Sequence, residues 1–280
     1  MLILACLPIG DVKDASTHLI EQIKDAKFIA AEDSRKFARF CQDLEIKHNA
    51  KVISFFDGNE SERLDELTAI LNSNKDILVV TDAGAPGISD PGYRLIRAAL
   101  EVNVQIKVLP GPSAVTTALL LSGFATDRFC FEGFPPRTKG AREKWFKELA
   151  HEERTIIFFE APHRILESLT DAADAFGNFR KGAICREMSK HYEEVIRGTL
   201  SELITWANSK DILGEITVVV EGFDLGTREF AQEDLIRLVI EQEKAGESRK
   251  EAIAQVAKEN GVAKRVVFDA MVAYKSGDKI

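Results

Sequence analysis

Short apolar runs rich in Val, Ile and Phe alternate along most of the chain with longer amphipathic stretches, and this alternation limits the choice of fold. The apolar runs have the length and composition of β-strands, and the amphipathic stretches have those of helices. Such alternation is typical of α/β proteins with largely parallel sheets. Continuous apolar strands also suit sheets that are covered on both faces.

The expected elements follow from this pattern. The predicted strands are Leu2–Leu7, Phe28–Ala31, Val52–Phe56, Ile77–Val80, Ile106–Leu109, Phe129–Phe131, Thr155–Glu160, Gly182–Arg186 and Ile216–Glu221. The predicted helices are Ala15–Lys24, Arg35–Leu44, Ser61–Leu71, Gly92–Val102, Ala114–Leu121, Ala141–His151, Arg164–Phe176 and Leu200–Asn208.

Charge and composition narrow the class of protein. The chain has 280 residues, with 37 Lys and Arg against 45 Asp and Glu, for a formal net charge of −8. Its apolar content of 45% and charged content of 29% exclude a disordered chain, a fibrous repeat and a coiled-coil rod. The acidic balance argues against a generic nucleic-acid coat protein, although a basic patch can lie on an acidic body.

Cysteine usage and the absence of long apolar runs indicate where the protein works. None of the four cysteines has a Cys-x-x-Cys spacing, and the five histidines show no metal-ligand spacing. We therefore expect a reducing compartment, no disulfide framework and no metal site. No run reaches the ~18 apolar residues that a membrane helix needs. The sequence thus predicts a cytoplasmic protein that does not enter a membrane.

A composition change divides the chain. The run from Phe129 to Pro136 is a short strand that leads into a Gly-Phe-Pro-Pro break, and residues 137–147 are basic. We expect one α/β domain over residues 1–128 and a second over 129–222. Residues 228–280 show only helical patterns and form a predicted helical tail.

The tail has the spacing of a helix-turn-helix, with small and apolar residues at Ala257, Gly261, Val262 and Val267. A three-helix cap or dimerisation element explains this pattern, and so does a contact with nucleic acid. The sequence leaves both interpretations open.

Several common catalytic signatures are absent from the sequence. No Gly-x-Gly-x-x-Gly follows a predicted strand, and there is neither a Walker A motif nor a His-Glu-x-x-His motif. The run Gly111-Pro112-Ser113-Ala114-Val115 lacks the second glycine of a nucleophile elbow. These absences disfavour hydride transfer, ATP hydrolysis, zinc proteolysis and serine hydrolysis.

Loops rich in glycine and proline follow three of the predicted strands, at residues 7–11, 81–92 and 110–114. In open α/β sheets, ligands bind outside the carboxyl ends of the strands. Glycine lets the backbone approach a ligand closely, and proline fixes the shape of a loop. The loops contain almost no Lys or Arg, which is unusual for a triphosphate site. They suit an uncharged adenosine with a small zwitterionic tail, such as S-adenosylmethionine.

A series of motifs gives the chain a family resemblance. They are Leu7-Pro8-Ile9-Gly10-Asp11, Ala30-Ala31-Glu32-Asp33-Ser34-Arg35, the 82–92 loop, 110–114, Phe131-Glu132-Gly133-Phe134-Pro135-Pro136-Arg137, Phe159-Glu160-Ala161-Pro162-His163-Arg164, Arg186-Glu187-Met188-Ser189-Lys190, the run 193–200 and the run 214–222. The sequence resembles the bacterial 16S ribosomal RNA (cytidine-2′-O)-methyltransferases of the tetrapyrrole methylase superfamily. The resemblance covers residues 1 to about 222, with a weaker match in the tail.

The resemblance implies two α/β domains with S-adenosylmethionine in the cleft between them, in a homodimer. It implies methyl transfer to the ribose 2′-oxygen of a cytidine, with 16S rRNA or the 30S subunit as the partner. Carried over position by position, the cofactor-binding residues are Pro8, Gly10, Asp82, Ala83, Gly84, Ser113, Ala114, Phe159, Glu187, Met188, Glu215 and Ile216.

The chain departs from the family pattern at four places. Leu7 replaces a usual Thr, Asp11 replaces Asn, and Ser34 replaces Thr but keeps the hydroxyl. A His that is common in the family near the position of Asn59 is absent from this chain. Its absence removes one candidate proton acceptor.

Methyl transfer to a ribose hydroxyl requires precise positioning and a proton acceptor. The candidates for that acceptor are Glu32, Asp33, Asp90 and His163. Each also has a structural explanation: the first two can cap a helix, Asp90 can form an Asx turn before a proline, and His163 can begin a helix.

Basic residues near the motifs are candidates for phosphate contacts, although each can also be a solvated surface charge. They are Arg35, Arg137, Lys139, Arg142, Arg164, Lys190 and Arg197. Two other functions stay open: a tetrapyrrole or other small-molecule methyltransferase on the same fold, and a non-catalytic ribosome-assembly or nucleotide-binding module.

Overall fold

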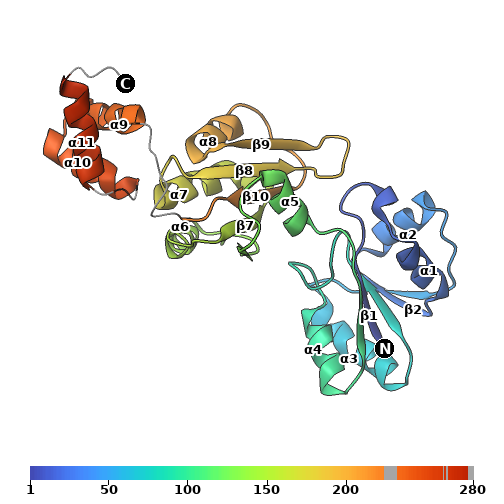
Figure 1. Cartoon of the computed structure of the whole chain (residues 1–280). Coiled ribbons are helices and arrows are strands. Elements are labelled where there is room, and N and C mark those ends of the chain that lie inside the picture. The colour runs from blue at the N-terminus through green and yellow to red at the C-terminus, as the bar shows by residue number, and fades with distance from the viewer. Residues whose placement is uncertain (224–231, 261, 263, 277–280) are drawn as a thin grey trace. The chain divides into compact units, whose positions relative to one another are not determined.

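The computed structural model of the chain describes residues 1–223, 232–260, 262 and 264–276 (Figure 1). The chain forms two compact units. The first comprises Met1–Ala118 and Glu187–Glu193, and the second comprises Leu119–Arg186 and Glu194–Ile280. The domains 1–128, 129–222 and 228–280 stay predictions. The bounds of the two compact units differ from them and place residues 187–193 with the first unit.

The first unit contains a five-stranded sheet in the order β3-β2-β4-β1-β5. Its strands are β1 (Leu2–Ala5), β2 (Phe28–Ala31), β3 (Lys51–Ser54), β4 (Ile77–Val80) and β5 (Ile106–Leu109). All the pairs are parallel, as the apolar runs predicted. The carboxyl ends of all five strands therefore lie along one edge of the sheet.

Helices cover both faces of this sheet, so the strands are apolar on both sides. On one face, α1 (Thr17–Asp25) and α2 (Ser34–Asp43) pack on alternate strand residues such as Ala5 and Ala31. On the other face, α3 (Glu60–Asn72) and α4 (Tyr93–Glu101) pack on the residues between them. A short 3-10 helix, Val12–Asp14, follows β1.

The helix α5 (Ala114–Ser122) follows the first sheet, and the division between the two units passes through it. The second unit contains a sheet in the order β6-β7-β10-β8-β9. Its strands are β6 (Phe129–Phe131), β7 (Thr155–Glu160), β8 (Lys181–Arg186), β9 (Glu194–Thr199) and β10 (Ile216–Val220).

The prediction of largely parallel sheets is wrong for the second unit. Only β6 and β7 are parallel, whereas β10 is antiparallel to both of its neighbours and β8 and β9 are also antiparallel. A buried strand is continuously apolar whichever way it runs, so its composition does not report its direction. The strand β9 is absent from the predicted elements.

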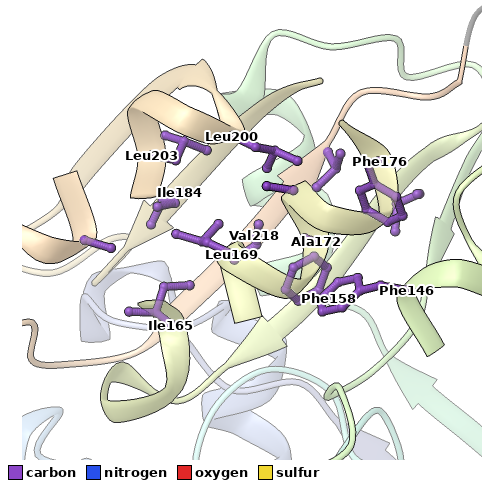
Figure 2. Packing of buried hydrophobic residues seen from close by; sticks show 14 of the residues in the cluster. Phe146, Phe158, Ile165, Leu169, Ala172, Phe176, Ile184, Leu200, Leu203 and Val218 are labelled. Atoms are coloured by element: carbon purple, nitrogen blue, oxygen red, sulfur yellow. The ribbon is translucent and has the colours of Figure 1, made fainter. Parts of the chain in front are cut away.

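Three helices pack on one face of the second sheet: α6 (Lys139–Glu148), α7 (Ile165–Phe176) and α8 (Leu200–Asn208). Figure 2 shows the core that they share with the strands, with Phe146 and Phe176 next to Phe158 and the aliphatic residues of α8 beside Ile184. A 3-10 helix, Pro162–Arg164, precedes α7.

The described residues of the tail form the helices α9 (Gln232–Lys244), α10 (Arg249–Glu259) and α11 (Lys264–Ser276), as the helical pattern predicted. It has a hydrophobic core of its own, which includes Leu235, Val256 and Met271. Ala257 and Val267 of the predicted helix-turn-helix are buried in that core, while Gly261 lies outside the described residues.

Candidate cofactor and active site

Two of the three glycine- and proline-rich loops are joined directly by backbone hydrogen bonds. The Leu7 amide donates to the Gly84 carbonyl at 2.9 Å, and the Gly84 amide donates to the Leu7 carbonyl at 3.1 Å. Gly84 has φ +67°, a left-handed conformation that a β-branched residue adopts only with strain. The loops after β1 and β4 are thereby fixed to each other at the carboxyl edge of the sheet.

The third loop, after β5, packs against the same place. A β-carbon at Gly111 would lie 2.9 Å from the Cys6 Cβ, so the chain can pass there only without a side chain. A β-carbon at Gly84 would lie 4.0 Å from the Pro112 carbonyl oxygen. Ser113 and Ala114 then lead into α5, where the Ser113 carbonyl accepts from Thr117. The three predicted cofactor loops therefore converge.

A network of acidic side chains lies beside these loops, where β2 and β4 end. The Asp82 amide donates to Glu32 Oε2 at 3.0 Å, and the Asp33 amide donates to Asp82 Oδ1 at 3.2 Å. Lys36 Nζ donates to Asp82 Oδ2 at 2.6 Å. Lys36 is a member of this network that the sequence motifs did not indicate. Its signal was its place in the first turn of the helix that follows the Glu-Asp pair.

The carboxyls of this network differ in their affinity for protons. Burial raises the pKa of Glu32 above its ordinary value, the Asp82 amide opposes this, and the negative charge of Asp82 adds to it. In contrast, hydrogen bonds from Arg35 hold the pKa of Asp33 well below its usual range. Asp33 also caps α2, because its Oδ1 accepts from the Arg35 amide. Glu32 is therefore the better proton acceptor of the two.

The long loop after β4 is held by a buried carboxylate at its far end. Glu60 Oε1 accepts from the Gly92 amide at 3.1 Å, where Gly92 has φ +136°. Inside the loop, the Gly87 amide donates to the Pro91 carbonyl at 3.1 Å. These bonds fix the backbone around Asp90, and no motif in the sequence indicates Glu60 as their anchor.

Residues 187–193 pack on the loop after β1. Ser189 Oγ donates to Asp14 Oδ2 at 2.6 Å and accepts from the Asp11 amide at 3.2 Å. Glu187 and Ser189 both have positive φ, at 52° and 63°. Because Gly10 has no side chain, its backbone can pack directly against Ser189. Pro8, two residues earlier, is buried. Met188 lies between the two strained residues.

The other predicted site residues belong to the second unit. Phe159 is the penultimate residue of β7, Glu215 precedes β10 and Ile216 begins it. His163 is exposed in the 3-10 helix before α7. Their participation in a cofactor site or in catalysis stays a prediction.

Arg142 is not available for the predicted contact with RNA. Only 2% of it is exposed, its Nε donates to Asp171 Oδ2 at 2.6 Å and its Nη2 donates to Glu167 Oε2 at 3.0 Å. Breaking a buried ion pair to reach a phosphate would leave an unpaired buried charge. The basic run near residue 140 misled the sequence analysis because one of its cations faces the core.

Two more predicted RNA contacts have structural partners instead. Arg164 Nη2 donates to the carbonyls of Pro135 and Pro136, at 2.8 and 3.0 Å. The Arg197 guanidinium donates to the carbonyls of Leu121 and Ser122 at the end of α5. Both guanidinium groups are therefore engaged by backbone carbonyls.

The remaining predicted RNA contacts have accessible cations. Arg35 is exposed beside Asp33, Lys139 is 76% exposed and lies 3.8 Å from Glu143, and Lys190 donates to Glu187 at 2.9 Å. Within the described residues, no hydrogen bond or ion pair engages the exposed Arg137.

No helix in the described part of the chain is long and apolar enough to cross a membrane. The same residues contain no His, Cys, Asp and Glu cluster that could hold a metal ion.

Comparison with known proteins agrees with this fold. Residues 1–204 match the model of the family Tetrapyrrole (Corrin/Porphyrin) Methylases. The uroporphyrin-III C-methyltransferase of Thermus thermophilus, complexed with S-adenyl homocysteine, has the same fold. Its structure superposes with a TM-score of 0.55 at 14% identity, over 78% of this chain and 95% of that one. The family match and the fold therefore define a methyltransferase that uses S-adenosylmethionine.

Two curated relatives are much more similar in sequence. Both are named ribosomal RNA small subunit methyltransferase I. The Mycobacterium tuberculosis protein is 44% identical over 97% of this chain and 94% of its own length. The Thermotoga maritima protein is 39% identical over 79% of this chain and 98% of its own length. The chain belongs to the tetrapyrrole methylase family and, within it, to the group of these small subunit methyltransferases.

Proposed function

We propose that the protein transfers the methyl group of S-adenosylmethionine to the ribose 2′-oxygen of a cytidine in small-subunit ribosomal RNA. The observation that carries the proposal is the convergence of the three loops beside Glu32 in a chain whose near full-length relatives are named for this RNA. The 2′-oxygen and the cytidine rest on the family resemblance of the sequence motifs.

The residues at the carboxyl edge of the first sheet fit such a cofactor. The loops offer backbone amides and carbonyls, and Asp82 already engages the nearby cation of Lys36. That donor set suits ribose hydroxyls and a positively charged sulfur better than a chain of phosphates. Asp82–Gly84, Pro8, Gly10, Ser113 and Ala114 would hold the cofactor. Phe159, Glu187, Met188, Glu215 and Ile216 would complete the site.

S-adenosylmethionine supplies a methyl group on a positively charged sulfur, which makes the methyl carbon an acceptor for an oxygen nucleophile. The chain must hold the 2′-hydroxyl in line with that carbon and remove its proton. Glu32 would take the proton, because its carboxylate lies beside the loops and burial makes it more basic than an ordinary Glu. Asp90 and His163 are the other candidates for this role.

Exposed cations would bind the RNA backbone. Lys139 begins α6 and Arg137 lies two residues before it, while Arg35 is the second residue of α2. Lys190 is half-buried in residues 187–193, which belong to the first unit. Phosphate contacts of this kind orient RNA without reading its sequence.

We also propose that the protein is a homodimer in the cytoplasm. The edge strand β5 leaves Val108 exposed, and Leu100 of α4 is exposed as well, so apolar surface is available for a second copy. Light scattering of the purified protein at several concentrations measures this directly, and a monomer at all of them overturns the dimer.

The decisive experiment asks which acceptor receives the methyl group. Purified protein is incubated with radiolabelled S-adenosylmethionine and, separately, with 30S subunits, free 16S rRNA or porphyrin precursors. Label should enter RNA, and the bond next to the modified nucleotide should resist alkali, because a 2′-O-methyl group removes the internal nucleophile. Label on a base or on a porphyrin contradicts the proposal, and the latter supports a small-molecule methyltransferase. Cofactor binding without transfer to any acceptor supports a ribosome-assembly module.

The placement of the cofactor is tested at Gly84. Gly84→Val strains a backbone at φ +67° that pairs with Leu7, so S-adenosylmethionine affinity in calorimetry should fall at least tenfold, or about 1.4 kcal/mol. Gly123→Val is the matched control, because it puts the same side chain at another positive φ where nothing lies within 4 Å of an added β-carbon. Equal affinity in folded Gly84→Val protein rules out this placement.

A further inference from the structure

An exposed aromatic ring lies at the end of a row of contacting phenylalanine rings in the second unit. Phe131 and Phe159 contact each other at 4.7 Å between ring centroids, and Phe134 contacts Phe159 at 5.5 Å with an interplanar angle of 61°. Phe131 and Phe159 are half-buried, whereas 53% of Phe134 is exposed. The Phe134 ring is thus supported on one side and open to solvent on another.

The backbone is fixed on both sides of this ring. Before it, the Phe159 amide donates to the Gly133 carbonyl at 2.8 Å, which extends the pairing of β6 with β7. After it, Arg164 donates to the carbonyls of Pro135 and Pro136. The two prolines restrict the chain further. Phe134 is therefore presented by a rigid loop.

A buried carboxylate holds Arg164 in this position. The Glu160 side chain is 0% exposed, and its Oε2 lies 3.3 Å from Arg164 Nη2. The same carboxylate accepts hydrogen bonds from Ser168 Oγ and from the Ala161 amide. Burial of a charged pair is expensive unless both partners are bonded, so a pair that supports a surface loop points to a function of that loop.

The surroundings of the ring select one kind of ligand. Arg137 is three residues away, exposed and without a partner in the described part of the chain, and Lys139 follows it. Cations beside an aromatic ring suit a polyanion that carries flat apolar groups. Unpaired RNA bases stack on aromatic side chains, and Arg and Lys bind the adjoining phosphates.

We propose that Phe134 is a stacking platform for an unpaired base of the RNA substrate, with Arg137 on a neighbouring phosphate and Arg164 as the residue that positions the loop. This inference rests on the proposed function and adds the place where a nucleotide of the RNA is held.

The first test replaces the ring. Phe134→Ala should raise the KM for the RNA substrate by roughly five- to a hundredfold, which is the range for loss of one stacked base. The S-adenosylmethionine Kd should not change, and Phe134→Tyr should restore most of the RNA affinity. Phe129→Ala is the matched control, because Phe129 is 38% exposed and begins β6, the strand whose other end leads into the loop that carries Phe134.

Three results overturn the inference. Unchanged RNA affinity in Phe134→Ala removes the stacking role. A weaker S-adenosylmethionine Kd instead assigns Phe134 to the cofactor. A change of oligomeric state in light scattering assigns it to a protein contact.

A binding assay separates this inference from the proposed function. A short single-stranded RNA that carries the fluorescent base 2-aminopurine is titrated with wild-type protein and with Phe134→Ala. Quenching by wild type alone supports stacking even where no methyl transfer to RNA is found. Equal quenching by both proteins contradicts stacking even where RNA is methylated.

The role of Arg164 is tested by a double-mutant cycle. Arg164→Met should raise the RNA KM without changing the S-adenosylmethionine Kd, as Phe134→Ala does. If Arg164 acts through Phe134, the RNA KM of the double variant should be no higher than that of the single variant with the higher KM, because the two changes remove the same interaction. Additive losses would show that Arg164 contributes independently and would contradict the positioning role.

Discussion

The Asp82 amide donates to the Glu32 carboxylate at 3.0 Å, and this bond joins the ends of two neighbouring strands, β2 and β4. Asp82 at the same time shares its own carboxylate between the Asp33 amide and Lys36. The charge of Asp82 is therefore compensated by Lys36, whereas the charge of Glu32 is compensated mainly by one amide.

Glu32 should make the folded protein less stable as the pH rises. Its pKa is higher in the folded state than in the unfolded chain, so its favourable contribution is complete below the ordinary Glu pKa and is lost as the pH passes the folded value. At neutral pH, Glu32→Gln should therefore raise the melting temperature, since the Gln oxygen can still accept from Asp82. The gain should vanish in acid.

The same variant should lose methyl transfer. Removal of a general base typically costs 10²- to 10⁴-fold in rate, so kcat should fall by about that factor with an unchanged S-adenosylmethionine Kd. Single-turnover assays of wild type and Glu32→Gln from acid to neutral pH measure it. A wild-type rate would exclude Glu32 as the proton acceptor, and a weaker Kd would make it a cofactor ligand.

Gly10 should not tolerate a side chain. An added β-carbon would lie 2.6 Å from the Ser189 carbonyl carbon and oxygen, so Gly10→Ala must displace residues 187–193. Overpacking of this kind costs about 1–3 kcal/mol of unfolding free energy, measurable by urea denaturation. Gly140→Ala is the control, because its β-carbon meets nothing within 4 Å in α6, and it should be neutral or slightly stabilising. Equal stabilities of the two variants would contradict this packing.

Arg142→Ala should damage the fold and not the binding of RNA. It leaves Asp171 buried without its cation, which costs about 3–5 kcal/mol of unfolding free energy. The paired replacement Arg142→Met with Asp171→Leu should recover most of that loss, because both charges are removed together. If Arg142→Ala is stable but binds RNA weakly, Arg142 binds RNA after all.

Arg137 and Lys139 should act on RNA through charge. The double variant Arg137→Ala, Lys139→Ala should keep wild-type stability and cofactor affinity, since neither side chain is buried. The slope of log affinity for RNA against log salt should become shallower by about 1 for each phosphate that the protein no longer neutralises. An unchanged slope over a salt series would assign both residues to the solvated surface.

The tail should be separable from the cofactor site. The buried residues of its core all belong to α9, α10 and α11, and the Thermotoga relative has no counterpart to about a fifth of this chain. A chain that ends at Gly226 should bind S-adenosylmethionine with nearly wild-type affinity in calorimetry, while methylation of the 30S subunit declines. Loss of cofactor binding in a truncated protein that remains folded would mean that the tail completes the site.

The sequence predicts the strands of the first sheet well because its three inner strands, β1, β2 and β4, are apolar and almost entirely buried. The bounds of β2, β4 and β5 match the predicted runs. The strand β9 is not predicted from the sequence, because it lies at a sheet edge and is half-exposed, so Glu194 and Arg197 interrupt its apolar pattern. Its antiparallel pairing with β8 depends on the short connection through residues 187–193, and no periodicity reports that.

Some features of the candidate site can likewise be predicted from the sequence, and others cannot. Glycines and prolines at strand ends marked the three loops, because their backbone requirements are visible in the sequence. The direction of a cation is not visible there: Arg137 is exposed, whereas Arg142 and Arg164 turn toward Asp171 and toward proline carbonyls. Acidic partners distant in sequence decide such cases, and only the fold brings them together.

The placement of residues 187–193 has a consequence for how the protein is made. These residues belong to the first unit, yet they follow β8 and precede β9 of the second. A nascent chain that has completed α5 already contains the whole first sheet, but it lacks the segment that covers Gly10. The first unit can therefore be finished only after β6, β7 and β8 have been synthesised. A chain stopped before residue 187 would carry the three loops with the surface around Gly10 uncovered.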